Sequence, residues 1–494
     1  MMGQQEPQKD LFNYAVNLDK RVRTNHPLRQ IQRAIDFGFV RERVASHYGF
    51  NGNESVPPEV ILKMMFLLFY DDVSSERDLM RIIPERLDYL WFLGYGLDDE
   101  IPDHSVLSKA RRRWGPEVFE ELFVRVVEQC VKGGLVEGCK IHMDGSLIEA
   151  NASKKSVIKG TPELIQALKK VYEDQLNKLD DKERGHLGDP HYEPVNDRMV
   201  SATDPDSAVV GKQGDSRPRY KQHRVVDDAK GVITALETTS GDVMENRKLM
   251  GMIEQHEQNT GIAVATVVAD RQYGTAENFR SCQERGIRSH MGDFLMSQLG
   301  KGRKEGIFSE ADFAYDSETD TYQCPAGKKL ACRMHMKDRR AYTYAAPDAT
   351  CSACRLRAEC TRAKGTARTI KRHEKQDLID AARIESHSEQ ARKDRIRRKW
   401  LMEGSFADAA NHHGFKRSRW RRLWRQKIQD YLIATCQNAR IFLRHIEQPR
   451  QATGIERALR KDQSLYHSCF WSDPGWFDEL MCWGAQSSMI FSMN

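Results

Sequence analysis

The stretch Lys140-Ile141-His142-Met143-Asp144-Gly145-Ser146 decides the fold class, because the sequence pattern changes here from helical to strand-like. Polar and apolar side chains alternate from Lys140 to Ala150, which is the pattern of a strand with one buried face. Residues 10–135 before it have the spacing of amphipathic helices, one of them opened by Pro57-Pro58. The strand therefore begins a second, sheet-containing part of the chain.

Strands and helices alternate after this first strand. The runs 220–226 and 231–237 flank a turn at 227–230 and predict a β-hairpin. The next expected elements are a helix at 245–258, a buried strand at 262–269, a helix at 276–285 and a short strand at 287–291. Further helices are expected from about 380 to 447, so the order predicts a mixed α/β fold.

Two segments interrupt this alternation. Residues 161–185 are charged and helical, and residues 186–219 are expected to form a polar loop. Residues 295–385 are expected to form an irregular insertion that carries cysteines. The predicted division is a helical domain at 10–135, the first part of a core at 138–294, the insertion at 295–385, C-terminal helices completing the core at 386–447, and a tail of unassigned role at 448–494.

Composition and charge narrow the class of protein. The 494 residues are enough for about two to four domains, and 30% of them are charged. Residues 391–425 hold twelve Lys or Arg against three acidic residues, which favours a polyanionic partner, although a solvated helical face is the alternative. The N-terminus has no apolar leader and the apolar run 64–70 is too short to cross a bilayer, so we expect a cytoplasmic protein without a membrane segment.

Three acidic residues stand in settings that suit catalysis. Asp144 and Asp270 end strand-like runs, and Glu403 lies on a basic helical stretch. Two Mg²⁺ or Mn²⁺ ions held by such carboxylates can direct the cleavage of a phosphodiester. Taken singly, an Asp after a strand is more often a turn or cap residue, and a helical Glu an ion-pair partner. The competing acids that spacing does not exclude are Asp242, Glu245 and Asp293.

Basic residues surround the predicted glutamate. Arg395 and Lys399 precede Glu403 by eight and four residues, so the three share roughly one helical face and the cations could grip a phosphate. The segment 412–425 is dense in arginine, whose guanidinium group binds phosphate well. Within this segment we expect Trp424 in the core, whereas Trp420 is a candidate for stacking on exposed bases.

Four cysteines are grouped in the predicted insertion. Cys324, Cys351, Cys354 and Cys360 include a Cys-x-x-Cys pair in an Arg- and Lys-rich segment, which is typical of a structural zinc site. Cys332 is a spare ligand nearby. Reduced free thiols in a loop are the alternative, and a redox pair is disfavoured because no thioredoxin-like pattern flanks it.

These motifs resemble those of bacterial insertion-sequence transposases of the DDE type. The likeness covers roughly residues 10–445, and its motifs are 144–153 for the first Asp, 269–278 for the second, 395–403 with Phe406, Gly414-Phe415 and Arg417 for the glutamate helix, and 426–438 for the closing helix. The resemblance implies an RNase H-like core with an all-α N-terminal domain and a small cysteine-rich insertion. It also implies two Mg²⁺ or Mn²⁺ ions on Asp144, Asp270 and Glu403, and it supports structural zinc.

The resemblance further implies partners and DNA-binding residues. The substrates would be the terminal inverted repeats of the protein's own element and a target DNA, handled by a homodimer at the bacterial nucleoid. The residues expected to contact DNA or phosphate are Arg395, Lys399, Tyr273, Arg417, Arg421 and Arg111. Two alternatives stay open: an RNase H-like nuclease without strand transfer, and an inactive, zinc-stabilised DNA-binding regulator.

Overall fold

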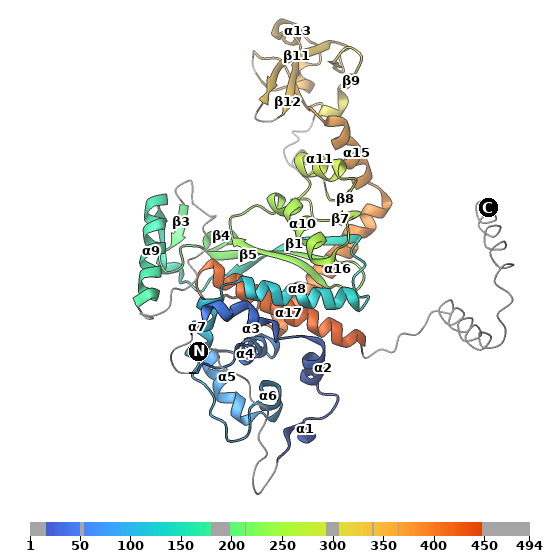
Figure 1. Cartoon of the computed structure of the whole chain (residues 1–494). Coiled ribbons are helices and arrows are strands. Elements are labelled where there is room, and N and C mark those ends of the chain that lie inside the picture. The colour runs from blue at the N-terminus through green and yellow to red at the C-terminus, as the bar shows by residue number, and fades with distance from the viewer. Residues whose placement is uncertain are drawn as a thin grey trace, which may run out of the picture. The chain divides into compact units, whose positions relative to one another are not determined.

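The computed structural model describes residues 16–49, 54–178, 198–212, 214–292, 306–337, 340–363 and 365–446 (Figure 1). The predicted tail at 448–494 lies outside these residues, as do the end of the predicted helix at 161–185 and part of the predicted loop at 186–219. Among the helices of these ranges, none combines the length and the apolar character that crossing a bilayer requires.

The N-terminal part is helical, as predicted. Its α-helices are α1 (Leu18–Arg21), α2 (Pro27–Ala34), α3 (Phe39–Val44), α4 (Pro58–Tyr70), α5 (Glu76–Ile82), α6 (Leu87–Leu93), α7 (Ser105–Trp114) and α8 (Glu117–Lys132). Helix α4 begins at the proline pair, and nearly all of its side chains are buried. A helix that is apolar all round belongs in a core, so α4 forms the centre of this helical part.

The central sheet contains the strands β1 (Lys140–Glu149), β5 (Asp215–Asp227), β6 (Ile233–Ser240), β7 (Thr266–Val268) and β8 (Arg288–His290). β5 and β6 form the predicted hairpin, and β5 runs antiparallel to β1. On the other side of β1, β7 and β8 continue the sheet in parallel. Helix α10 (Leu249–Thr260) connects β6 to β7, and α11 (Ala276–Glu284) connects β7 to β8. This order, β6-β5-β1-β7-β8 with its helical crossovers, is the RNase H-like topology, so the predicted fold class is confirmed.

Helices cover both faces of this sheet (Figure 1). Ile141 and Met143 of β1 pack against α10 and α11, whereas Ile148 packs with α4, α8 and the C-terminal helices. The C-terminal helices are α15 (Gln376–Ser386), α16 (Glu389–His412) and α17 (Leu423–Ile446). Because strand side chains alternate between faces, Asp144 lies on the same face as Ile148, the face covered by α16 and α17.

The prediction of a polar loop at 186–219 was wrong for the described part of this segment. Strands β2 (Val157–Gly160), β3 (Arg198–Ser201) and β4 (Ala208–Lys212) extend the sheet beyond β5, which itself begins at Asp215. These strands have only four or five residues each, too few to show a clear alternating pattern. Their pairing is set by the neighbouring strand, and a polar sequence pattern does not reveal such pairing.

The prediction that the insertion at 295–385 is irregular was wrong for its described part. This segment forms an antiparallel sheet of β9 (Ala314–Asp316), β10 (Thr321–Gln323), β11 (Lys329–Met336), β12 (Ala341–Ala345) and β13 (Thr369–His373). Two short helices, α13 (Asp348–Ser352) and α14 (Arg357–Cys360), lie between β12 and β13. The sheet has its own small core, which includes Phe313, Tyr322, Leu330, Tyr344 and Ile370.

Candidate active site

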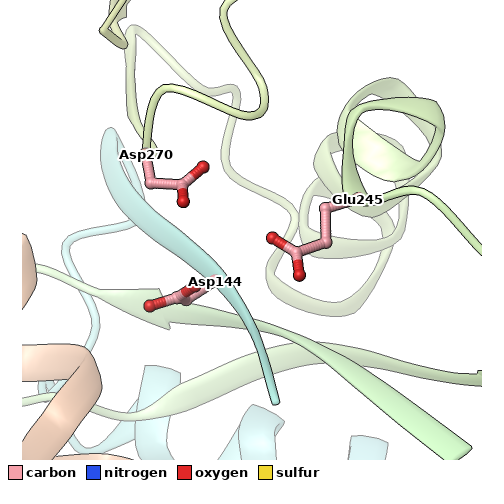
Figure 2. Close-up of side chains that lie close together, drawn as sticks. All are labelled: Asp144, Glu245 and Asp270. Carbon is pink, nitrogen blue, oxygen red and sulfur yellow. The ribbon is translucent and has the colours of Figure 1, made fainter. Parts of the chain in front are cut away.

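Strand register brings the two predicted aspartates together. In the parallel pair of β1 and β7, His142 lies opposite Val268. Asp144 and Asp270 each follow two residues later, so Asp270, just past the end of β7, lies beside Asp144 in the middle of β1. Figure 2 shows the two aspartates on one side of the cluster and Glu245 on the other.

Glu245 is the third carboxylate of this cluster. One ligand oxygen each from Asp144, Glu245 and Asp270 lies within 4.8 Å of the others (Figure 2). Glu245 opens the short 3₁₀ helix at Glu245–Lys248, directly before α10. A Cβ atom on Gly145 would come within 2.8 Å of the Glu245 carboxyl group, so the glycine makes this approach possible.

Two cations balance part of the negative charge. Arg398 of α16 donates from Nη1 to Asp144 Oδ2 at 2.8 Å, and Lys221 Nζ lies 3.6 Å from Glu245 Oε1. Burial raises the pKa of Asp144, although Arg398 opposes this shift. Burial likewise raises the pKa of Glu245, with Lys221 lowering it and the two aspartates raising it further. Three carboxylates with only two nearby side-chain cations suit the binding of additional positive charge.

Glu403 is not part of the cluster formed by Asp144, Glu245 and Asp270. It is exposed on α16, and the α16 side chain that reaches Asp144 is Arg398. The inner face of α16 carries Asp394 and Arg398, four residues apart, and Met402 follows at the same spacing. Glu403 lies one residue beyond that row and is thus turned toward solvent. From the sequence, Glu245 was predicted only as a competing acid, and Arg398 was not predicted at all. Its i, i+4 spacing from Asp394 is the sequence signal that places both residues on one face of the helix.

Two of the predicted DNA-binding residues are buried. Tyr273 is fully buried, and its hydroxyl group lies among the core residues beneath the acidic cluster. Arg111 forms an ion pair with Glu76, and its guanidinium carbon lies 3.9 Å from the centre of the Trp420 ring. Neither side chain is placed to touch a DNA backbone, so both expectations are corrected.

The other predicted phosphate contacts differ in their exposure. Lys399, Arg417 and Arg421 are exposed, and Arg421 Nε donates to the Asn151 carbonyl at 3.1 Å. Arg395 is half-buried, and its Nη1 donates to the Ser386 carbonyl at 2.6 Å. Lys399, Arg417 and Arg421 therefore keep surfaces that a phosphate could reach, whereas Arg395 joins α16 to the end of α15.

The four grouped cysteines line one pocket of the β9–β13 sheet. Cys324, Cys351, Cys354 and Cys360 all border it, while Cys332 is exposed on β11. Burial raises the pKa of the Cys360 thiol, and the three neighbouring thiols raise it further. Lys328 N donates to Cys324 Sγ at 3.3 Å, in a turn closed by Gly327 N bonded to the Cys324 carbonyl. The sulfur atoms share the pocket without approaching as closely as the three carboxylates do.

Comparison with known proteins gives two family matches. Residues 16–113 match a family model described as "Transposase domain (DUF772)", and residues 323–442 match one described as "Transposase DDE domain". No curated protein matches the chain significantly.

One solved structure that resembles the chain is a cryo-EM structure of the piggyBac transposase synaptic complex with hairpin DNA. It has 8% sequence identity and a TM-score of 0.34, and the alignment covers 87% of this chain and 76% of that one. A TM-score this low does not show a shared fold. The two family matches flank the segment that contains Asp144, Glu245 and Asp270.

Proposed function

We propose that this chain, a transposase of the DDE type, uses Asp144 and Asp270 as the central metal-binding pair for cutting transposon ends and joining them to target DNA. The observation that supports this proposal best is the clustering of three carboxylates, from β1, β7 and the turn before α10, within 4.8 Å. An RNase H-like sheet holds the two aspartates rigidly, as a site for phosphoryl transfer requires.

The donor set fits Mg²⁺ or Mn²⁺. Both ions prefer carboxylate and water oxygens and need few protein ligands. When bound, a pair of such ions would activate the attacking water or hydroxyl group and stabilise the leaving oxygen. Asp144 and Asp270 would hold the ions beside β1, just past the end of β7. Arg398, which contacts Asp144, is placed to pair with a phosphate oxygen once the carboxylate charge is neutralised.

Two glutamates are candidates for the remaining metal ligand. Glu245 already meets both aspartates. Glu403 lies within the segment that matches the DDE domain, on the helix whose Arg398 contacts Asp144. We propose that both contribute, Glu245 from the α10 side of the sheet and Glu403 from the α16 side.

Cleavage and joining of DNA from the two ends of the segment that carries the gene would test this proposal. With Mg²⁺, the wild type should nick these ends and join them to a plasmid. Asp144→Asn and Asp270→Asn should each lower cleavage by about a hundredfold or more while DNA binding remains. Nicking without joining would indicate the nuclease, and binding without cleavage the inactive regulator.

The same assay tests which of the two glutamates binds metal. Glu245→Gln and Glu403→Gln should each lower cleavage by about tenfold or more if both carboxylates bind metal. Full activity of Glu403→Gln would remove Glu403 from the site. Full activity of Glu245→Gln would reduce Glu245 to an ion-pair partner of Lys221.

DNA ends have to be brought together before they are joined to a target, which requires at least two protomers. We therefore propose a homodimer in the complex with terminal inverted repeats, acting at the bacterial nucleoid. Arg417 and Arg421 are exposed beside β1, where the backbone of Arg417 forms an isolated β-bridge with the backbone of Glu149. Both are proposed to hold DNA phosphates near the site.

We also propose that Cys324, Cys351, Cys354 and Cys360 bind one structural Zn²⁺. All four border one pocket, and the backbone N–H group directed at Cys324 Sγ is the kind of bond that stabilises a thiolate ligand. The surrounding sheet has a small core, so a bound metal would add the stability that it lacks.

A further inference from the structure

Trp400 is an exposed aromatic residue on the helix that contacts the catalytic Asp144. Its relative exposure is 75%, and that of Ile396, one turn earlier, is 54%. The other tryptophans of the described residues, Trp91, Trp114, Trp420 and Trp424, are buried or partly buried. A large aromatic side chain exposed to water on a helix that contacts the acidic cluster suggests a binding role.

Trp420, which the sequence left open as a candidate for stacking on bases, has its ring covered by other side chains. It packs edge-on against Phe69 at 5.7 Å between ring centroids, and the Arg111 guanidinium covers its ring. Trp424 is buried in the core, as predicted. Within the part of the chain that the structure describes, Trp400 is therefore the tryptophan available to an external ligand.

The surroundings of Trp400 are cationic. Ile396 follows Arg392 by four residues, and Lys399 and Trp400 follow Ile396 by three and four. The four side chains therefore form one exposed stripe along α16, which Glu403 continues. Among the described residues, neither Arg392 nor Lys399 makes an ion pair, whereas the nearby Lys393 pairs with Glu389 at 2.7 Å. Two unpaired cations beside an exposed indole fit a polyanion that also offers flat apolar faces.

The stripe lies on the helix that contacts the acidic cluster, but on the outer face of that helix. Trp400 is two residues beyond Arg398, which is about 3 Å along the helix axis and about 200° around it. The stripe is therefore an outer surface of α16 and does not line the acidic cluster. In an intact duplex the bases are stacked on each other, so the indole can stack only on a base that is unpaired.

We propose that the stripe formed by Arg392, Ile396, Lys399 and Trp400 binds single-stranded or frayed DNA. Trp400 stacks on an unpaired base, and Arg392 and Lys399 contact phosphates of the same strand. This inference rests on the proposed function, because it deepens the account of how this chain binds DNA. A second copy of the chain is the rival occupant. The lysine and arginine without partners favour DNA, since lysine is depleted in protein interfaces.

Binding without catalysis tests the inference independently of cleavage. The probes are a fluorescein-labelled oligothymidylate of about 20 nucleotides, longer than the usual site for one binding fold, and a blunt duplex of equal length, both in EDTA. Trp400→Ala should weaken binding of the single strand by about tenfold. Trp400→Phe should restore it to within about threefold, and Trp400→Leu should not, because leucine is apolar but cannot stack. Duplex binding should change little in all three variants.

Further variants separate the contribution of Lys399 from that of Trp400 and control for misfolding. Lys399→Ala should lower the slope of log affinity against log salt by about one, as the loss of one phosphate contact requires. Ile384→Ala is the matched control, because Ile384 is also 75% exposed but lies on α15. Unchanged thermal unfolding of Trp400→Ala will exclude misfolding.

Three results would overturn the inference: unaltered single-strand affinity of Trp400→Ala, equal loss for single strand and duplex, or a change in oligomeric state with DNA binding intact. The last would assign the stripe to a second copy of the chain. Asp144→Asn should keep full single-strand binding. Failure of the cleavage assay and failure of this inference are therefore distinguishable.

Discussion

At the scale of single residues, the aspartates could be predicted from the sequence and their glutamate partner could not. Asp270 follows the end of β7 and Asp144 lies inside β1, and the parallel pairing of these two strands places the aspartates side by side. The approach of Glu245 depends on the absence of a side chain at Gly145, which lies on β1 a hundred residues earlier, and local sequence carries no sign of that contact. Glu403 was predicted from its place on a basic helical stretch and from the resemblance, and the structure leaves it exposed on α16.

The charge on Glu245 should make the metal-free protein less stable at neutral pH. Burial raises the pKa of this carboxyl group, so the native state binds more protons than the unfolded state between the usual pKa near 4.5 and the raised value. Stability from this group therefore falls as pH rises through that window. In EDTA, Glu245→Gln should be more stable than the wild type above the window, and the difference should shrink below it.

Urea unfolding from pH 5 to pH 8 measures this difference. Excess Mg²⁺ should reverse the order, because saturating ligand adds about 2.7 kcal/mol at a hundred times its Kd to the protein that binds it. In the variant, Lys221 loses the charge of Glu245 but keeps its hydrogen bond to the Val243 carbonyl, so it is not left without a partner. A variant that is less stable than the wild type at every pH would show that Glu245 serves as an ion-pair partner.

At the scale of elements, amphipathic helices and the β5–β6 hairpin were predictable, whereas the strands outside the core were not. The helices carry a long apolar repeat, and the hairpin has two β-rich runs around a short turn. Strand β11 shows the difficulty: six of its eight residues are exposed, so little hydrophobic pattern marks it. Its pairing with β10 and β12 exists only once the neighbouring strands are in place.

The docking of α16 against the sheet should depend on Asp394. This residue is almost fully buried, and its carboxylate accepts from Lys140 Nζ at 3.1 Å and lies 2.7 Å from His290 Nδ1. Asp394→Ala leaves Lys140 without its anion and leaves His290 with Glu385 alone, so it should lower the free energy of unfolding by about 3 kcal/mol. Because Arg398 lies one turn further on, the change should also weaken the contact with Asp144 and lower cleavage.

Glu389→Ala is the matched control for this prediction. Glu389 lies on the same helix and pairs with Lys393, but both side chains are exposed. Loss of such a surface pair should cost less than about 1 kcal/mol in urea unfolding. Equal effects of the two substitutions would show that the buried contacts of Asp394 do not hold α16 in place.

At the scale of the whole molecule, the chain is predicted to need two kinds of metal at separate places. The acidic cluster draws on residues 144 to 270, and the cysteine pocket belongs to the β9–β13 sheet, which is inserted between β8 and α15 and has its own hydrophobic core. A segment with its own core can lose its stabilising metal without unfolding the rest. Purified protein should therefore contain about one zinc per chain that Mg²⁺ does not displace.

Removing the zinc should loosen the inserted sheet and leave the RNase H-like core folded. The double variant Cys351→Ser, Cys354→Ser should lose the zinc and, in hydrogen exchange, lose protection in β9–β13 but not in β1 or α17. Cys332→Ser is the control, because Cys332 is exposed on β11 outside the pocket and should leave metal content unchanged. Less than about half an equivalent of zinc in the wild type would contradict the site. Loss of protection throughout the core would instead mean that the insertion and the core fold as one cooperative unit.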